Sequence, residues 1–346
     1  MTVTGHNRAA VLYAPHDVRI EERPVPLPGP EDVLVEVRAV GVCGSDVHYY
    51  EHGRIGRFRV EAPLVLGHET SGVVVALGRN VQSLTLGQRV ALEPGVPCGR
   101  CRQCRTGRYN LCPLMRFFGT PPVDGAFTQY VAIHADFAHR LPNALSDEAG
   151  ALVEPLAVAV WACQKGGVRP GHDVLVSGAG PVGQLAAQVA LAFGATAPTV
   201  TDVLEERLRG LAARGVRTVD VSTTSLQSLG IEADVFLECS GSESALVGGI
   251  KCLRPGGVCV CVGMGPSGST TIPLALVQNR ELLLTGTFRY ANTYPAAIAL
   301  AASGRVDLET LVTSRHTLDE TEEALQVTKS ALALKAIVLP GASASG

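Results

Sequence analysis

The sequence predicts an α/β protein with two domains, and three observations lead to this prediction. The chain has 346 residues, a length that suits two domains of ordinary size better than one. Its first 150 residues contain short β-type runs separated by Gly and Pro, which favour a mainly-β domain. From Asp173 onward, short apolar runs alternate with Ala- and Leu-rich segments. This alternation favours a doubly wound parallel sheet.

Three runs in the first part are of β type: DVLVEVRAV at 32–40, SGVVVALG at 71–78 and QRVALEP at 88–94. Long segments with helical periodicity do not occur in the sequence between residues 8 and 150. The last fifty residues mix helix and strand patterns, and we expect them to return to the first domain. The predicted boundaries are 1–155 with 290–346 for the first domain and 156–289 for the second.

Five runs in the second part are expected to be strands of one sheet: DVLVS at 173–177, PTVTD at 198–202, ADVFLECSG at 233–241, GGVCVCVG at 256–263 and LLLTGTF at 282–288. Helical segments follow the first three runs. One ends near Phe193, one spans Glu205 to Arg214 and one reaches Leu253. Strands and helices in this order predict βαβ units.

Composition and charge exclude several classes of protein. The chain is 46% hydrophobic and carries 29 basic against 32 acidic residues, a net charge of −3. Global disorder is excluded, and no basic excess is available for nucleic acid or an anionic membrane. The N-terminal residues lack the apolar segment of a secretory signal. We therefore expect a cytoplasmic protein without nucleic-acid or membrane partners.

The motif GAGPVG follows the first strand of the second part and opens the next helix. Gly178, Gly180 and Gly183 would let the backbone approach a pyrophosphate, which the helix N-terminus stabilises. Asp202 ends the next strand, where its carboxylate would bind ribose hydroxyls and repel a 2′-phosphate, so NAD is favoured over NADP. The alternative is a glycine-rich turn of another α/β protein, with Asp202 as a helix cap. Arg207 would lie either beside the adenine or on a solvated helix face.

Four cysteines lie within fifteen residues in the spacing C-x2-C-x2-C-x7-C: Cys98, Cys101, Cys104 and Cys112. Four thiolates this close can surround one tetrahedral zinc ion, and a set without His or carboxylate indicates a structural site. An iron–sulfur centre is a competing interpretation. A disulfide pair is a third one, which a reducing compartment disfavours.

Further candidate metal ligands are dispersed along the chain: Cys43 in GVCGSDVH, His68 and Glu69 in GHETSG, and Glu154 in LVEPLAVAV. Each residue alone is more simply explained as a buried thiol, a core histidine or a capping carboxylate. Thiolate, imidazole and carboxylate are zinc ligands, however, and here they accompany a dinucleotide-binding motif. The combination favours a catalytic metal site.

These motifs resemble those of the zinc-dependent medium-chain dehydrogenases, in order and over nearly the whole chain. The general likeness lies in CGSD at 43–46, GHE-x2-G-x5-G at 67–78, the four-cysteine segment and GAGPVG. A narrower likeness to the sorbitol and other polyol dehydrogenases lies in HYYEHGRIGRF at 48–58, GRYNLCP at 107–113, FFGTPPVDGAF at 117–127, EAGALVEPLAV at 148–158 and TFRYANTYP at 287–295. The resemblance implies a mainly-β GroES-like catalytic domain and a Rossmann coenzyme domain.

The resemblance also implies residue roles. Cys43, His68 and Glu69 would hold a catalytic zinc, with Glu154 beside it, and either carboxylate is a candidate for the direct ligand. Asp46 would orient His68, while Ser45 and His48 match proton-relay positions. Positions matching substrate contacts are Tyr49, Phe118, Thr120, Glu154, Arg289 and Tyr290. Positions matching cofactor contacts are Pro181, Val182, Asp202, Arg207, Val262, Gly263, Met264, Thr287, Phe288 and Arg289.

The activity implied by the resemblance is reversible, NAD-dependent oxidation of a secondary hydroxyl of a sorbitol- or xylitol-type polyol to the ketose. Two zinc ions are implied, one catalytic and one structural. Xylitol and L-arabinitol dehydrogenases are alternatives, followed by L-threonine 3-dehydrogenase, for which Arg289 offers an anion contact. A metal-free nucleotide-binding structural or sensor protein is an alternative from another class. The resemblance further implies a homotetramer, or a dimer, with the apolar segment near 255–290 as an interface.

Overall fold

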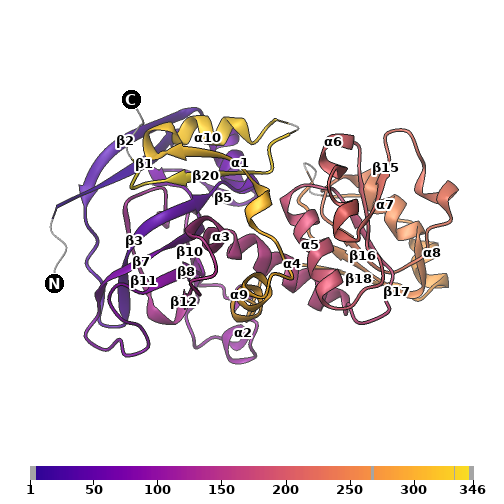
Figure 1. The fold of residues 1–346 in the computed structure, drawn as a ribbon, viewed down its shortest axis with the longest axis horizontal. Coiled ribbons are helices and arrows are strands. Elements are labelled where there is room, and N and C mark those ends of the chain that lie inside the picture. The colour runs from indigo at the N-terminus through magenta and orange to yellow at the C-terminus, as the bar shows by residue number, and fades with distance from the viewer. Residues whose placement is uncertain (1–4, 266–268, 331, 343–346) are drawn as a thin grey trace. The chain divides into compact units, whose positions relative to one another are not determined.

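The computed structural model describes residues 5–265, 269–330 and 332–342, and the chain divides into two compact units (Figure 1). Unit 1 comprises Met1–Glu154 and Leu308–Gly346, and unit 2 comprises Pro155–Asp307. Residues 290–307 therefore belong to unit 2, whereas the sequence placed the return to the first domain at residue 290. Hydrogen bonds account for the difference: Asp307 N donates to Gln188 Oε1 at 2.8 Å, and Arg214 Nη2 donates to Asp307 Oδ2 at 2.7 Å.

A seven-stranded sheet forms the centre of unit 1. Its members are β3 (Asp32–Gly41), β7 (Glu69–Leu77), β8 (Arg89–Leu92), β11 (Tyr130–His134), β12 (Ala138–Arg140), β19 (Val312–Thr317) and β20 (Lys335–Leu339). Their order is β12-β8-β7-β3-β20-β19, and β11 also pairs with β3. The strands predicted at 32–40, 71–78 and 88–94 are confirmed as β3, β7 and β8. Because β20 pairs with β3, the C-terminal segment from Leu308 onward belongs to this unit.

Smaller elements complete unit 1. The further strands are β1 (His6–Ala14), β2 (Asp17–Pro24), β4 (Arg54–Ile55), β5 (Phe58–Arg59), β6 (Leu64–Val65), β9 (Gly95–Val96) and β10 (Arg116–Phe117). The α-helices are α1 (Gly44–His52), α2 (Arg102–Arg105), α3 (Asp147–Ala151) and α10 (Thr321–Val327), and α4 (Val153–Gly166) leads into unit 2. Short 3-10 turns are η1 (Tyr109–Leu111), η2 (Ala135–Phe137), η5 (Glu309–Leu311) and η6 (Leu318–Glu320). Apolar side chains of the strands and of α1 and α10 form one core.

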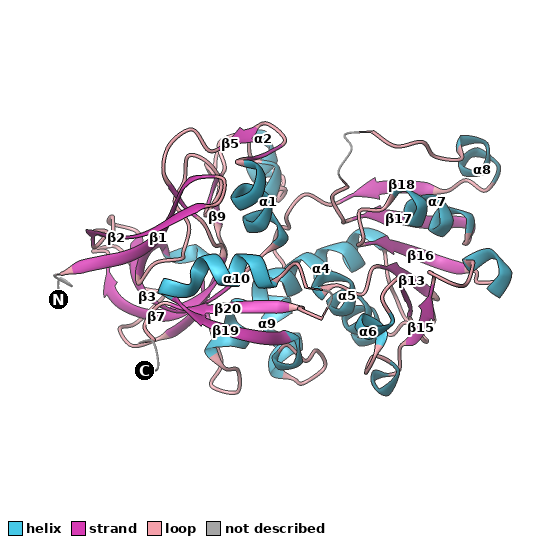
Figure 2. Ribbon diagram, turned by 90° about the horizontal axis from the view of Figure 1, so that it is seen from above, coloured by secondary structure: helices cyan, strands magenta, loops and turns pink. Residues whose placement is uncertain are grey.

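Unit 2 contains a six-stranded parallel sheet, seen in Figure 2 with its strands stacked beside one another. Its strands are β13 (Val174–Ser177), β14 (Thr199–Asp202), β15 (Arg217–Asp220), β16 (Ala233–Glu238), β17 (Leu253–Cys261) and β18 (Leu283–Gly286). The order is β15-β14-β13-β16-β17-β18, and every pair is parallel. The chain order reverses between β13 and β16, which is the point where such sheets bind dinucleotides.

The helices of unit 2 are α5 (Pro181–Ala192), α6 (Glu205–Leu208), α7 (Glu243–Lys251), α8 (Leu274–Asn279) and α9 (Tyr294–Ala302), with the 3-10 turns η3 (Ala212–Arg214) and η4 (Leu226–Leu229). The five predicted strands and the helices before Phe193 and Leu253 are confirmed. The single helix predicted from Glu205 to Arg214 is wrong, because the chain breaks into α6 and η3. Gly210 between them has φ +81°, a left-handed conformation that interrupts a helix.

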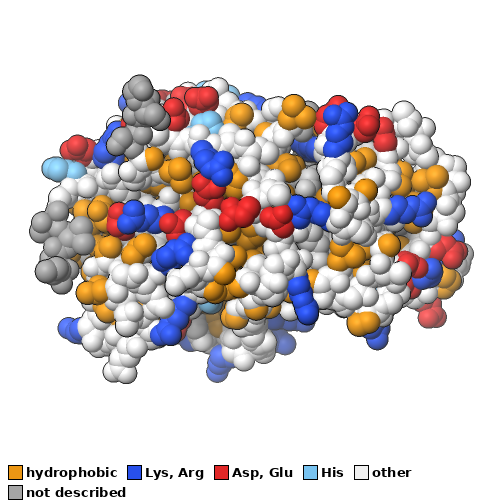
Figure 3. All heavy atoms as spheres, in the orientation of Figure 1, with side chains coloured by type: hydrophobic (Ala, Val, Ile, Leu, Met, Phe, Trp, Pro, Cys, Tyr) orange, Lys and Arg blue, Asp and Glu red, His pale blue; other side chains and the backbone are white. Residues whose placement is uncertain are grey.

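Charged side chains of both signs are interspersed on the face that Figure 3 shows. Within unit 1, Arg315 forms a two-pronged ion pair with Glu148, with both N–O distances at 2.7 Å. Within the described residues, no helix combines the length and the apolar content needed to cross a membrane.

Candidate functional site

Three candidate metal ligands converge in unit 1. Cys43 directly precedes α1, and His68 and Glu69 stand where β7 begins. One ligand atom from each of the three residues lies within 4.8 Å of the other two. His68 and Glu69 are buried and Cys43 is partly buried. The two sequence motifs that carry these residues therefore meet at one point.

Asp46 joins the two motifs. Its Oδ2 accepts a hydrogen bond from Cys43 N at 2.9 Å, and its Oδ1 accepts one from Gly67 N at 3.0 Å. The same Oδ1 lies 3.5 Å from Nδ1 of His68. Burial alone would lower the pKa of His68, but the charges of Asp46 and Cys43 and the hydrogen bonds to them hold it well above its ordinary value. With Nδ1 facing Asp46, Nε2 of His68 remains for a ligand.

The two oxygens of the Glu69 carboxylate have different surroundings. Lys335 Nζ, at the start of β20, donates to Glu69 Oε1 and to the Val42 carbonyl oxygen, the latter at 3.2 Å. Glu69 Oε2 is buried and has no hydrogen-bond partner among the described residues. Gly41 makes room for it, since a Cβ there would lie 2.1 Å from Oε2.

This donor set fits a zinc ion. A thiol, an imidazole nitrogen and a buried carboxylate oxygen without a partner are the groups that zinc binds, and a buried acceptor is seldom left unpaired. Glu154 is buried too, but it is not one of the three residues that meet within 4.8 Å. It lies near enough to contribute to the raised pKa of Lys335, after Glu69 and Cys43, which offset the lowering by burial.

The remaining residues expected near this site in unit 1 lie on α1 and after β10. Ser45, His48 and Tyr49 belong to α1, where His48 is exposed and Tyr49 is buried. Phe118 is buried, and Thr120 N donates to the Phe117 carbonyl oxygen at 3.1 Å. The Phe117 ring itself lies 5.5 Å from the His68 ring, centroid to centroid. The sequence singled out Phe118 but missed its neighbour Phe117.

Cys98, Cys101, Cys104 and Cys112 also converge, with their sulfur atoms all within 4.8 Å of one another. All ten cysteines of the chain are free thiols, so the disulfide interpretation does not hold for this structure. Backbone N–H groups of Arg100 and Cys101 lower the pKa of Cys98 to about 6, whereas burial raises that of Cys104 to about 12. A single tetrahedral zinc would place its sulfur ligands about 3.8 Å apart, from a Zn–S bond of about 2.3 Å. The cluster fits one ion better than a larger multi-iron group.

The glycine-rich turn follows β13 at the reversal point of the unit 2 sheet. Gly178 has φ +87°, and a Cβ there would lie 3.0 Å from the backbone of Ser240. A Cβ on Gly183 would lie 1.8 Å from the Gly178 carbonyl oxygen, so the helix approaches the turn closely. Gly180 is the N-cap of α5, with Pro181 as its first residue and Val182 next, and a Cβ on it would meet open space. The turn therefore has the exposed backbone that a pyrophosphate requires.

Asp202, at the end of β14, faces this turn. Its Oδ2 accepts a hydrogen bond from Ala179 N at 2.7 Å, and its Oδ1 accepts one from Leu204 N at 2.9 Å. The carboxylate thus touches the glycine-rich turn and is not the N-cap of α6, which is Leu204. Arg207 is half-buried on α6, and its carbonyl oxygen accepts a hydrogen bond from Gln184 Nε2 at 3.3 Å.

Glu238, the last residue of β16, forms hydrogen bonds on the other side of the sheet reversal from Asp202. Its buried Oε1 accepts hydrogen bonds from Ser177 Oγ at 3.2 Å, Ser240 N at 2.8 Å and Gly241 N at 2.9 Å. Its carbonyl oxygen accepts from Val262 N and Gly263 N, both at 2.8 Å. The ends of β13, β16 and β17 are thereby tied together. The sequence identified Val262 and Gly263 but missed Glu238.

The other predicted cofactor and substrate positions of unit 2 lie after β17 and β18. Met264 and Phe288 are exposed, and Thr287 N donates to the Cys261 carbonyl oxygen at 3.0 Å. Arg289 has φ +55° and stacks on the Phe288 ring at 4.9 Å. Tyr290 is buried, with its ring 5.7 Å from that of Tyr294.

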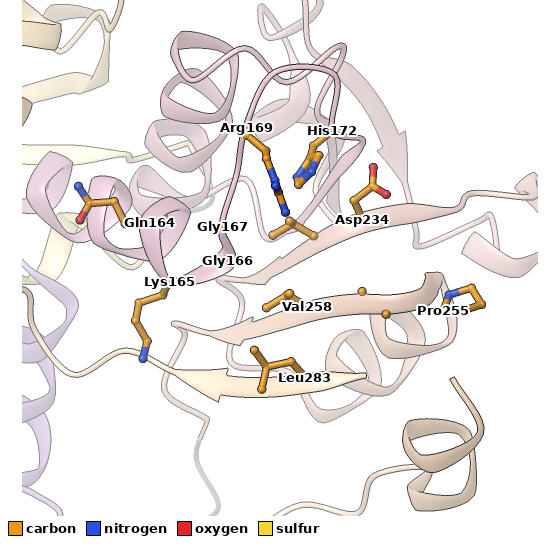
Figure 4. Close-up of a pocket in the computed structure, with 13 residues that line it drawn as sticks. Gln164, Lys165, Gly166, Gly167, Arg169, His172, Asp234, Pro255, Val258 and Leu283 are labelled. Carbon is orange, nitrogen blue, oxygen red and sulfur yellow. The ribbon is translucent and has the colours of Figure 1, made fainter. Parts of the chain in front are cut away.

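A cavity of about 380 Å³ lies at the amino ends of β16 and β17, the opposite end of the sheet from the glycine-rich turn. Its lining includes Lys165, Arg169, His172 and Asp234. Figure 4 shows the Lys165 side chain pointing away from Arg169 and His172. Because this cavity lies at the opposite end of the sheet from the glycine-rich turn, it does not coincide with the nucleotide site that the turn predicts.

Lys335 is the residue beside the candidate metal ligands that motif reasoning could least reveal. It lies 266 residues after Glu69 and belongs to none of the motifs. The available signal was a lysine in the apolar run LALKAIVL at 332–339, since a lysine is seldom buried without a partner.

Two family models match the chain. One describes an alcohol dehydrogenase GroES-like domain and covers residues 29–143, and the other describes a zinc-binding dehydrogenase and covers residues 181–303. Together they cover most of both units.

Individual relatives match over almost their full length. Sorbitol dehydrogenase of Homo sapiens is 44% identical over 339 residues, 95% of each chain. A probable D-xylulose reductase A of Neosartorya fischeri is 43% identical over 350 residues, 97% of this chain and 98% of the relative. The crystal structure of an oxidoreductase of unknown specificity from Escherichia coli superposes with a TM-score of 0.92 at 34% identity, covering 97% of this chain and 99% of that one.

Proposed function

Because this chain belongs to the zinc-dependent medium-chain alcohol dehydrogenase family, we propose that it is an NAD-dependent polyol dehydrogenase. Its reaction is the reversible oxidation of a secondary hydroxyl of a sorbitol- or xylitol-type polyol to the ketose. The observation that carries this proposal is the convergence of Cys43, His68 and Glu69, in which Oε2 of Glu69 has no hydrogen-bond partner in the part of the chain that the structure describes. The relatives named for sorbitol and D-xylulose, at 43–44% identity, support the substrate class.

In this proposal Cys43, His68 and Glu69 hold the catalytic zinc, and Glu69 rather than Glu154 is the direct carboxylate ligand. The bound metal would supply Lewis-acid polarisation of a substrate oxygen, and a bound nicotinamide coenzyme would supply the hydride acceptor. Asp46 fixes the ring orientation of His68 through its contact with Nδ1. The four cysteines of the other cluster hold a structural zinc.

The proton of the substrate hydroxyl leaves through acceptors on this chain. Glu154 is buried within the electrostatic reach of Lys335, and it is the first candidate acceptor. Ser45 and His48 lie on α1, which begins directly after Cys43, and the exposed His48 can pass a proton to solvent. Tyr49, Phe118 and Thr120, which all belong to unit 1, bind the substrate in this proposal.

NAD binds at the sheet reversal of unit 2. Gly178, Gly180 and Gly183 give the pyrophosphate access to the N-terminus of α5. The negative charge of Asp202 favours the ribose hydroxyls of NAD and repels the 2′-phosphate of NADP. Arg207 would lie beside the adenine, and the other contacts would come from Pro181, Val182, Val262, Gly263, Met264, Thr287, Phe288 and Arg289.

The chain assembles as a homotetramer, or as a dimer, through the segment near 255–290. The edge strand of the unit 2 sheet, β18, supports this proposal, because an unpaired edge can pair with another chain. Leu283 on β18, Met264 and Phe288 expose large apolar side chains. Size-exclusion chromatography with light scattering tests it: Leu283→Asp is expected to lower the mass. An unchanged mass would exclude this edge as the interface.

The substrate class is tested by initial rates of NADH formation with sorbitol, xylitol, ribitol, L-arabinitol and galactitol, with ethanol and L-threonine as controls. A preference for one polyol with silent controls is the expected result. Turnover of L-threonine alone, or none with zinc bound, would leave the family assignment intact and refute the proposed substrate class.

A further inference from the structure

Lys335 is a buried cation beside the candidate zinc ligands. Lys335 is 4% exposed, and its ammonium group donates to Glu69 Oε1 and to the Val42 carbonyl oxygen. A buried ammonium is costly unless it is paired and hydrogen-bonded. The pairing is specific, because Glu69 is also buried and its other oxygen, Oε2, has no partner among the described residues.

The surroundings of Lys335 are strongly anionic. Its ammonium group pairs directly with the Glu69 carboxylate, and the side chains of Cys43 and Glu154 lie within electrostatic reach of it. A bound zinc ion would bring two further positive charges to the same carboxylate and thiolate, so the ammonium and the metal share Glu69.

We propose that Lys335 is a positioning residue that holds Glu69 ready for zinc and supplies a counter-charge to the ligand set when zinc is absent. This inference rests on the zinc site of the proposed function and explains what sets the zinc affinity of that site. By pairing with Oε1, Lys335 leaves Oε2 available to the metal. It also stabilises the charged Glu69 carboxylate in the metal-free protein. The same pairing lowers the affinity of the site for zinc.

Two opposite effects follow from removing this charge. The metal-free protein loses stability, because Glu69 is left as a buried and unpaired carboxylate. The zinc-bound protein loses much less, because the metal then supplies the positive charge. Zinc affinity must consequently rise, and loss of one neighbouring unit charge predicts an increase of about tenfold.

The test compares the full-length wild type with Lys335→Met, both zinc-loaded and stripped by a chelator. Thermal unfolding gives the loss of stability in each state, and competition with a chromogenic chelator gives the zinc affinity. The four-cysteine cluster is the same in both proteins, so its contribution cancels in the comparison. Lys329→Met is the matched control, since Lys329 pairs with Glu51 on the surface of the same unit and is expected to leave zinc affinity unchanged.

The expected result is a larger fall in melting temperature for metal-free than for zinc-loaded Lys335→Met, together with tighter zinc binding. The double variant Lys335→Met/Glu69→Gln should recover at least half of the metal-free loss, because it leaves no unpaired charge. Equal falls in melting temperature for the metal-free and the zinc-loaded variant, with unchanged or weaker zinc binding, would overturn the proposal. Lys335 would then be a purely structural lysine. Failure of both Lys335→Met and Lys335→Gln to fold even with zinc would also overturn it. A wild type that binds no zinc through Cys43 would instead refute the proposed function.

Discussion

The Oδ1 atom of Asp46 lies 3.5 Å from Nδ1 of His68, and both side chains are buried. The same carboxylate accepts backbone hydrogen bonds from Cys43 and Gly67, so it fixes both ligand-bearing segments at once. A carboxylate that orients a ligating histidine in this way contributes to metal affinity without touching the metal.

Asp46→Asn is therefore expected to weaken zinc binding or lower kcat/KM about 10- to 100-fold while the protein remains folded. Chelator competition and polyol kinetics measure the two quantities. Asp32→Asn is the control, because Asp32 accepts a backbone hydrogen bond from Gly29 elsewhere in unit 1. If Asp46→Asn keeps both zinc and rate, the orienting role is refuted.

Asp202→Asn is expected to weaken NAD binding and to lower the preference for NAD over NADP by about tenfold or more, because the charge that repels a 2′-phosphate is removed. The ratio of kcat/KM for the two cofactors measures this preference. Asp220 lies opposite Asp202 on the neighbouring strand β15, so Asp220→Asn is a closely matched control. An unchanged ratio in Asp202→Asn would exclude it as the selecting residue.

Cys101→Ser is expected to remove one zinc per chain and lower the melting temperature, since a structural site of four thiolates contributes directly to folding. Elemental analysis and thermal unfolding measure both effects. The matched control is Cys163→Ser, a change at a buried thiol outside both clusters. A folded, fully active Cys101→Ser with unchanged zinc content would contradict the structural assignment.

Arg254 ties together the amino ends of β13 and β16 through Asp173 at 2.7 Å and Asp234 at 3.0 Å. Burial raises the pKa of Asp234, but hydrogen bonds from Asp173 N and Arg254 bring it below its ordinary value. A carboxylate with a lowered folded-state pKa stabilises the fold above its unfolded pKa, and this contribution is lost as the pH falls through the folded-state value.

Arg254→Met should thus lower the free energy of unfolding by about 1 kcal/mol at neutral pH, a magnitude typical of partly exposed ion pairs. The difference from wild type should shrink below about pH 4. Denaturant unfolding at several pH values measures this difference in the free energy of unfolding. Arg217→Met is the control, because Arg217 is exposed. A difference that does not vary with pH would assign the effect to packing instead.

The sequence predicted the strands and motifs well because local periodicity and glycine placement reflect local physics. It failed at Glu205–Arg214, where one glycine in a left-handed conformation outweighed the helical pattern. It also could not choose between Glu69 and Glu154, because only the fold shows which carboxylate meets Cys43 and His68. Lys335 and Glu238 act through contacts between distant segments or with backbone atoms. The apolar run around Lys335 indicates that this lysine is buried, but it does not identify Glu69 as its partner.

In the proposed function, NAD-dependent polyol oxidation depends on a zinc ion held by Cys43, His68 and Glu69. The most direct test measures zinc per chain, NAD binding and NADH formation with the preferred polyol, for the wild type and for Cys43→Ser. We expect two zinc ions and turnover for the wild type, and one zinc ion, normal NAD binding and no turnover for Cys43→Ser. Turnover by Cys43→Ser with one zinc ion fewer than the wild type would contradict it.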